Sequence, residues 1–349
     1  EGLITILDKY TDDNLSAWSH NWVNKPGMPH YKVDSLSQLD LKGLNYGFYV
    51  LPEELSATLM NNVVEEHLTP SEKASALVIL YENYLNERIS GFDYTLFLLD
   101  CLESLSKEDS SQSTLVFRRA LSQLGTILWK ENNLQQTEWE GRLTKLISQS
   151  QSESCRRAVF SALLNAPHSQ STSEMFLAAF MIPESFISFE LTNADLNSLC
   201  QQLAVRKEEI APQLIAKQRE RLSHPDLIAQ FDYIAPALAS SPEARLVCFQ
   251  SFLNAENREV EPWTLTVLRL LNHPLRQQEA LSYIRPALEI IEEIQLTGDI
   301  FFPTNWCSAL LGGHYSEEAK KEVELFLAQY SDTLNPLLIQ KIQQAAYYI

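Results

Sequence analysis

Apolar residues recur along most of this chain at the spacing of one helix face. One segment illustrates the order i, i+3, i+4, i+7 and i+8 with Leu77, Leu80, Tyr81, Tyr84 and Leu85. This spacing places the side chains on one side of a helix. Similar patterns return in successive segments, separated by short polar or proline-containing junctions. The pattern therefore predicts a chain built almost wholly of amphipathic helices.

Capping residues mark where many of these helices begin. Thr69 and Glu72 can form a capping box around Pro70, a residue favoured in the first helical turn. Thr192 and Asp195 open another helix in a similar way. Together such signals predict helix starts near residues 53, 70, 92, 112, 135, 154, 172, 193, 225, 242, 262, 275, 304, 316 and 335.

The spacing of these starts indicates a repeated architecture. The starts recur about every 20 residues, so helix pairs recur about every 40, close to the ~40–47-residue unit of HEAT and armadillo arrays. No repeat consensus is visible at single positions. The predicted fold class is therefore all-α, a superhelix of antiparallel helical hairpins with degenerate HEAT- or armadillo-like repeats and a concave face.

The chain before residue 53 has a different character. Asn14 is a plausible N-cap for a short helix with one apolar stripe formed by Leu15, Trp18 and Trp22. Pro26-Gly27 should end that helix and residues 28–33 should continue extended. The predicted organisation is a short helical and extended segment at 1–33, a linker and lead-in at 34–52, and a helical-repeat domain at 53–349.

Composition supports the all-α prediction and excludes several kinds of partner. Only 10 of 349 residues are glycine, against a usual ~7%, which disfavours folds that depend on phosphate-binding glycine loops. The formal net charge is −18. Such a charge repels nucleic acids and anionic membrane surfaces. We therefore expect neither a nucleic-acid partner nor, without a run of about 20 apolar residues, insertion into a membrane.

The cysteines suggest packing rather than chemistry. The five, at 101, 155, 200, 248 and 307, are widely separated and contain no CxxC pair. We expect buried free thiols that behave as small apolar groups. This pattern leaves the compartment of a soluble chain open between cytoplasm and periplasm.

The seven histidines form no recognisable metal motif, since neither HExxH nor ExxH occurs. His67 is expected in the last turn of a helix, where the helix dipole favours it. His224, His273 and His314 lie at junctions and are expected to cap. GxSxG and GxxxxGK[ST] are also absent. The sequence therefore assigns no catalytic residue, no metal ligand and no cofactor to this chain, and leaves substrate-binding residues unknown.

Residues 295–327 form the densest aromatic cluster. Gly298 is expected to end a helix in the left-handed conformation. The connection 299–303 is expected to be buried against neighbouring elements, and Trp306 belongs to the helix that follows. Two interpretations remain open: a hydrophobic plug between the last hairpins, or the wall of a ligand cavity.

Several stretches resemble a known family. SAWSHNWVNKPGMPHYKV, residues 16–33, resembles the end of the catalytic domain in M1-family zinc aminopeptidases, where a tryptophan-bearing helix precedes Gly-x-Pro and a strand. LNYGFYVL, residues 44–51, resembles the lead-in to that family's C-terminal helical domain. Residues 297–327 and 338–349 resemble the end of that domain in bacterial members. The resemblance covers most of residues 12–349 and is strongest at the two ends.

The resemblance implies that residues 1–33 are the remnant of a peptidase domain and that 53–349 close over its zinc site. The parent enzyme would remove N-terminal residues from peptides, with zinc bound only in the parent. The family's HExxH and Gly-x-Met-Glu-Asn motifs have no counterpart here, so the isolated chain is expected to be inactive. The implied partners are the upstream catalytic domain and peptide substrates.

Two other functions remain open. A stand-alone helical-repeat scaffold that binds a partner protein would have the same composition and periodicity. An all-α enzyme would need an apolar pocket with a strongly shifted carboxylate. The family also commonly places a β-sandwich before the helical domain, whereas only residues 34–43 stand in that place here.

Overall fold

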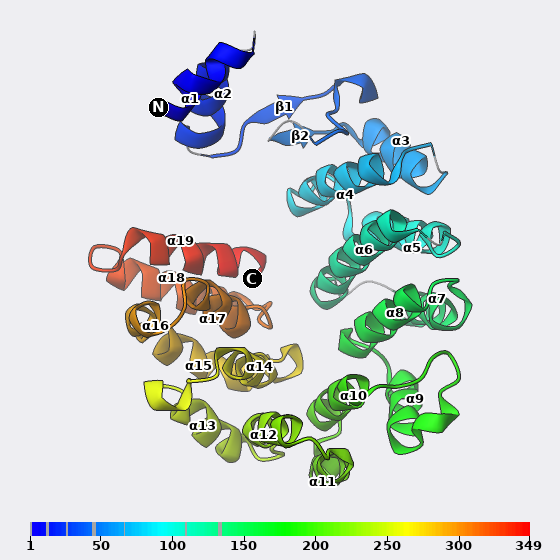
Figure 1. Ribbon diagram of the computed structural model, residues 1–349, viewed down its shortest axis with the longest axis vertical. Helices are drawn as coiled ribbons and strands as arrows, with labels where there is room; N and C mark the ends of the chain where they lie inside the picture. Colours follow the sequence, from blue (N-terminus) through cyan, green and yellow to red (C-terminus); the bar gives the residue numbers. More distant parts are fainter. Residues whose placement is uncertain are drawn as a thin grey trace. The chain divides into compact units, whose positions relative to one another are not determined.

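The structure is a computed structural model. It describes residues 2–11, 14–25, 27–43, 47–65, 67–108, 110–131 and 135–349. This part of the chain is predominantly helical with two short strands (Figure 1), which confirms the all-α prediction at that level. The chain separates into two compact units, unit 1 at residues 1–163 and unit 2 at 164–349.

Unit 1 begins with a short helical and extended segment. Helix α1 (Gly2–Leu7) precedes α2 (Leu15–Ser19), which continues as a π-helical turn, and strand β1 (His30–Lys32) follows. Strand β2 (Phe48–Val50) pairs with β1 in parallel, with His30 opposite Phe48. The predicted extended exit is thus confirmed as β1, whereas Pro26, Tyr46 and the Trp22 side chain lie outside the described part.

The remaining helices of unit 1 are α3 (Glu53–Val64), α4 (Pro70–Leu85), α5 (Gly91–Leu105), α6 (Ser111–Lys130), α7 (Gln136–Gln149) and α8 (Glu153–Asn165), whose last residues belong to unit 2. Helix α3 packs on α4 and α5, α5 packs on α6 and α7, and α4 packs on α6. The capping box predicted at Thr69 and Glu72 opens α4.

The helices of unit 2 are α9 (Gln170–Met181), α10 (Asn193–Arg206), α11 (Ala211–Arg221), α12 (Pro225–Ile234), α13 (Pro242–Ser251), α14 (Glu261–Leu271), α15 (Gln277–Glu289), α16 (Ile291–Thr297), α17 (Phe302–Leu311), α18 (Glu317–Tyr330) and α19 (Pro336–Ala345). Helix α10 packs between α9 and α11. A second series packs in the order α12, α14, α17 and α19, and α15 lies against α17 and α18. No described helix is long and apolar enough to cross a membrane.

All predicted helix starts lie within two residues of an observed one. The prediction missed α11 and α16. Helix α11 begins directly after the 3-10 turn Glu208–Ile210 and has no side-chain cap. Helix α16 is separated from α15 by Ile290 alone. Helix α11 does carry one sequence signal, Pro212 in its first turn, which the prediction overlooked. The junction at Ile290 has no side-chain cap.

The connection before α17 departs from its prediction. Gly298 is extended, with φ −95° and ψ 177°, so the expected left-handed conformation is wrong. Ile300 and Phe301 are 79% and 67% exposed, whereas Phe302 is 2% exposed. Asp299 Oδ1 accepts hydrogen bonds from the N–H groups of Phe301 and Phe302. This turn starts α17 so that only Phe302 faces the core.

The plug interpretation therefore holds for two residues of the cluster. Phe302 and Trp306 pack edge to face in the core, and Trp306 Nε1 donates to the carbonyl of Ala287 at 3.1 Å. The five cysteines are all buried free thiols, as predicted. Burial raises the pKa of the Cys101 and Cys307 thiols to about 12, which keeps them protonated and unreactive.

Candidate functional site

The histidines at helix junctions take the expected capping role in two cases of three. His224 Nδ1 accepts from the N–H of Asp226, and His273 Nδ1 accepts from the N–H of Leu275. His314 instead is buried and bonds to the side chain of Asn272. His67 lies beyond α3, which ends at Val64, so its placement in a last helical turn is wrong.

The described residues contain no group of three or more His, Cys, Asp or Glu that could hold a metal ion. The zinc that the family resemblance implies for a parent enzyme therefore has no fitting ligand set in this part of the chain.

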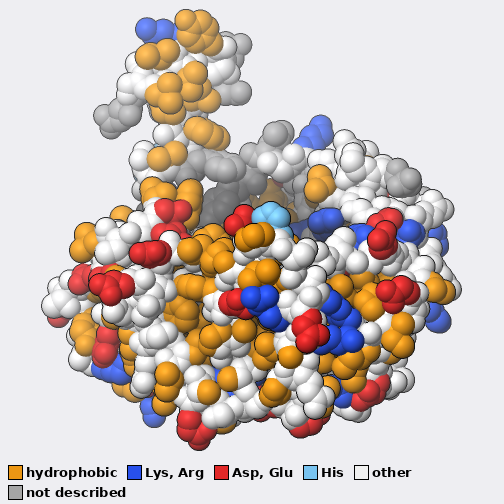
Figure 2. All heavy atoms as spheres, turned by 60° about the horizontal axis from the view of Figure 1, so that its bottom comes forward, with side chains coloured by type: hydrophobic (Ala, Val, Ile, Leu, Met, Phe, Trp, Pro, Cys, Tyr) orange, Lys and Arg blue, Asp and Glu red, His pale blue; other side chains and the backbone are white. Residues whose placement is uncertain are grey.

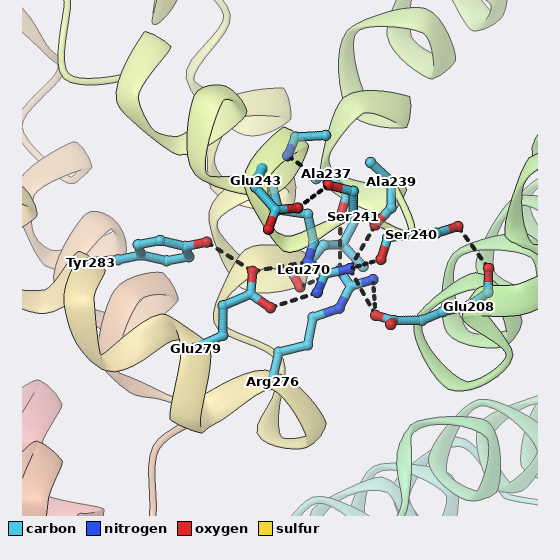
Figure 3. Close-up of polar contacts among 12 residues, drawn as sticks. Glu208, Ala237, Ala239, Ser240, Ser241, Glu243, Leu270, Arg276, Glu279 and Tyr283 are labelled. Atoms are coloured by element: carbon cyan, nitrogen blue, oxygen red, sulfur yellow. Dashed lines mark hydrogen bonds and ion pairs between the residues drawn. The ribbon is translucent and has the colours of Figure 1, made fainter.

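Unit 2 contains a network of buried charges, which we call the Arg245 network (Figure 3). Arg245 is 2% exposed and donates Nη2 to Glu279 Oε2 at 2.5 Å and Nη1 to Glu208 Oε1 at 2.8 Å. Arg276 is 5% exposed and donates to the same Glu208 oxygen at 3.2 Å. The two guanidinium groups also donate to the backbone carbonyls of Ala237, Ala239, Ser240 and Leu270.

The charges of this network compensate one another. Burial opposes ionisation of Glu279, but hydrogen bonds from Arg245 and Tyr283 outweigh it and lower the pKa of Glu279. Burial, followed by the charge of Arg245, lowers the pKa of Arg276. Figure 3 shows Glu279 and Tyr283 on one side and Glu208 on the other. Two cations with two carboxylates form a structural junction rather than a free binding site.

A cavity of about 580 Å³ lies between α3 and α5 in unit 1. Its lining includes four carboxylates, Glu53, Glu65, Asp93 and Asp100. Three of them have structural contacts. Asp93 accepts from Ser90 at the start of α5, Asp100 accepts from Arg142, and Glu65 pairs with His67. These carboxylates serve helix ends and helix packing, so they identify no ligand.

A cavity of about 440 Å³ in unit 2 has a different lining, and we call it the α10–α14–α17 cavity. Its walls come from α10, α14, α17 and the junctions beside them. The lining residues are Asn165, Gln201, Gln202, Thr266, Arg269, Leu270, Asn272, His273, Pro274, Ser308, Ala309, Gly312 and Gly313. Amides and hydroxyls provide most of the polar groups, and no carboxylate is among them.

Four hydrogen bonds fix the wall of this cavity. His273 Nδ1 accepts a backbone N–H, so the ring carries its proton on Nε2 and donates it to Gln202 Oε1 at 3.1 Å. Asn272 donates to the carbonyl of Leu268, and its Oδ1 lies 3.1 Å from His314 Nε2. Gly313 permits the close approach, because a Cβ there would overlap the carbonyl oxygen of Asn272.

Both histidines of this wall are held neutral. Burial, then the charges of Arg206, Arg276 and His168, lower the pKa of His273 to about 3. Burial alone lowers the pKa of His314 to about 4. The charged groups that lower the pKa of His273 are all basic.

One interpretation of residues 295–327 was the wall of a ligand cavity, and four of these residues line this cavity: Ser308, Ala309, Gly312 and Gly313. No sequence signal pointed to the rest of the lining. Its residues are up to 148 positions apart, from Asn165 to Gly313, and share no motif spacing. Gln201-Gln202 and Asn272-His273 read in sequence as ordinary helix-surface and junction residues. Only the packing of α10 against the ends of α14 and α17 brings them together. The sequence matches no protein-family model, and no curated protein is significantly similar to it.

Proposed function

We propose that this chain is the non-catalytic C-terminal helical domain of an M1-family zinc aminopeptidase. In that role it shapes and gates the peptide cavity over a zinc site in the parent enzyme. The observation that carries the proposal is the N-terminal segment, whose sequence resembles the end of the catalytic domain and whose described apolar side chains are mostly exposed.

The exposed apolar side chains of that segment support the proposal that another domain covers it. Leu3, Ile6, Tyr10 and Val23 are 68%, 54%, 83% and 70% exposed, and Trp18 is 46% exposed. Figure 2 shows hydrophobic side chains gathered on this segment, at the top of that view. Contiguous exposed apolar residues are typical of a surface that another domain covers. The catalytic domain of the parent is the partner we propose.

The packing of the helices supports a HEAT-like superhelix. In unit 1, α3, α5 and α7 pack in one series while α4 packs on α6. In unit 2, α12, α14, α17 and α19 form a comparable series. Alternate helices that contact in series are what stacked helical hairpins produce. Such an array would present one layer of helices to the peptide.

The proposed mechanism is enclosure. A domain that closes over an active site excludes water and limits which substrates enter. Zinc-activated water, bound in the parent, would supply the hydrolytic chemistry. The side chains of this chain would orient the distal part of the peptide. Neutral amides and hydroxyls, such as those of the α10–α14–α17 cavity, suit a peptide backbone because they both donate and accept hydrogen bonds.

The coding sequence upstream of Glu1 tests the proposal directly. We expect an open reading frame that encodes HExxH followed by a glutamate ligand. A start codon with only a secretion signal encoded between it and Glu1 would contradict it and favour the alternative, a stand-alone scaffold that binds a partner protein.

An assay of the purified chain provides a second test. We expect no stoichiometric zinc binding and no hydrolysis of aminoacyl substrates, because the family's catalytic motifs are absent from the sequence. Metal-dependent turnover by the pure chain would show that it is an enzyme in its own right.

A further inference from the structure

We propose that the α10–α14–α17 cavity binds a carboxylate, which Arg269 and the neutral donors of the wall would hold. The proposal concerns the chemistry of the ligand. That the carboxylate belongs to a peptide rests on the proposed function.

The charge of the lining is the first reason. The chain has 45 acidic residues against 27 basic ones, yet the cavity lining contains no carboxylate and one cation, Arg269. By contrast, the α3–α5 cavity has four carboxylates beside its one arginine, Arg88. The α10–α14–α17 cavity is thus the one of the two in which an anion would meet no carboxylate on the walls.

The state of Arg269 is the second reason. The guanidinium groups of Arg245, Arg258, Arg276 and Arg285 each form an ion pair with a glutamate. No ion pair joins Arg269 to any carboxylate of the described residues, and its side chain is exposed at the cavity. An arginine with its planar fork free can bind a carboxylate through two parallel hydrogen bonds.

The wall supplies further donors in a fixed arrangement. Because His273 donates its Nε2 proton to Gln202 Oε1, the amide nitrogen of Gln202 remains as a donor. His273 stays neutral, so this arrangement does not change near neutral pH. A ligand carboxylate would therefore meet oriented N–H groups beside the guanidinium of Arg269.

Two sources of the carboxylate can be distinguished with three dye-labelled peptides of one sequence. The first has a free C-terminus, the second a C-terminal amide, and the third a C-terminal amide with one internal Gln replaced by Glu. Binding to the whole chain is measured by fluorescence anisotropy. We expect one carboxylate-bearing peptide to bind about tenfold more tightly than the amide peptide, the scale of one charge-assisted bidentate contact. The peptide that gains affinity identifies the source.

Variants of one residue locate the effect. Arg269→Gln should reduce the preference for the carboxylate to less than about threefold, and Arg269→Lys should retain part of it, because a lysine keeps the charge but loses the fork. Arg219→Gln, an exposed arginine on α11 that pairs with Asp232 outside the cavity, should leave the preference unchanged. Circular dichroism checks that each variant folds.

Three outcomes overturn the inference. They are equal binding of all three peptides, no binding of either carboxylate peptide up to millimolar concentration, and a preference that survives Arg269→Gln. These results are independent of the upstream coding sequence. A missing preference alongside an upstream HExxH refutes the carboxylate site alone, and a clear preference without HExxH refutes the aminopeptidase proposal alone.

Discussion

The Arg245 network and the α10–α14–α17 cavity meet at one junction and use their polar groups in opposite ways. Residues 272–276 contribute Asn272 and His273 to the cavity and Arg276 to the network. In the network, two buried cations face two carboxylates and four backbone carbonyls. In the cavity wall, neutral side chains hold one another in place by hydrogen bonds, and the amide nitrogen of Gln202 remains as a donor for a ligand.

The comparison distinguishes polar groups that are fully used in holding the fold together from polar groups that can still bind a ligand. The ion pairs of the two buried arginines fix the positions of the 3-10 turn Glu208–Ile210, α13 and α15. Removing one member of a pair leaves the other charge without its partner. The polar groups of a cavity wall need only part of their hydrogen-bonding capacity for their own positions. Substitutions should therefore affect stability in the network and binding in the cavity.

The largest expected effect is the loss of Arg245. Arg245→Met should lower the free energy of unfolding by roughly 2–4 kcal/mol, because Glu279, with its side chain 23% exposed, would lose its cation. Urea denaturation of the whole chain measures this. Arg285→Met is the matched control. Arg285 pairs with Glu289 in a half-exposed site, so its loss should cost less than about 1 kcal/mol. Equal losses of unfolding free energy in the two variants would show that the Arg245 network contributes no more than a surface ion pair.

The second effect concerns the glycine in the cavity wall. A Cβ at Gly313 would overlap the backbone carbonyl of Asn272, whereas a Cβ at Gly91 would meet only the carboxyl end of the Glu131 side chain. Backbone cannot move aside as a side-chain end can. Gly313→Ala should therefore destabilise by about 2 kcal/mol and Gly91→Ala by less than about 0.5 kcal/mol. Thermal unfolding of both variants tests the pair, and a larger loss for Gly91→Ala would contradict this description of the wall.

The third effect is a pH dependence that belongs to the cavity. His273 and His314 have folded pKa values of about 3 and about 4, below the unfolded value of ~6.5. Their neutral forms contribute full stability above pH ~6.5, and this contribution is lost as the pH falls toward 4 and 3. Unit 2 should lose on the order of 1–2 kcal/mol per histidine between pH 7 and pH 5.

Hydrogen exchange resolved by peptide mass can follow unit 2 separately across this range. His273→Asn keeps a capping side chain and should remove roughly half of the loss between pH 7 and pH 5. The Arg245 network should not contribute, since the pKa of Glu279 is lowered from a value already below this window. An acid sensitivity that His273→Asn leaves unchanged would place its origin elsewhere.

Helix positions were predictable because their causes are local. Thr69 with Glu72 and Thr192 with Asp195 form the capping boxes that the sequence indicates, and Ser316 caps α18 as expected. Helix α16 escaped prediction because a single residue, Ile290, separates it from α15. Local signals thus determine a helix only where its end leaves polar groups for a cap to satisfy.

Most of the cavity lining and the exposed connection were not predictable because their causes are tertiary. Apolar composition suggested that residues 299–303 are buried, yet the Asp299 turn directs Phe301 outward and Phe302 inward. Nothing in the neighbourhood of Arg269 distinguishes it from other helix-surface arginines. That no described glutamate pairs with it depends on which helices end beside α14, and periodicity within one helix does not contain that information.

The smallest effect on stability is expected for Arg269 itself. Arg269→Gln should change the free energy of unfolding by less than about 0.5 kcal/mol, because the side chain is exposed and has no ion pair among the described residues. Urea denaturation beside Arg245→Met provides the comparison under identical conditions. A glutamine at position 269 keeps the helix propensity close to that of arginine, so any change reports the contacts of the guanidinium.

This prediction decides whether the cavity can be assigned a function at all. If Arg269→Gln is neutral for stability, a loss of carboxylate binding in the same variant must arise at the ligand. If instead it costs more than about 1 kcal/mol, Arg269 has a structural contact comparable to those of the Arg245 network. The contrast between the two regions would then fail, and lost binding would report a damaged fold. Stability and binding therefore have to be measured on the same preparation.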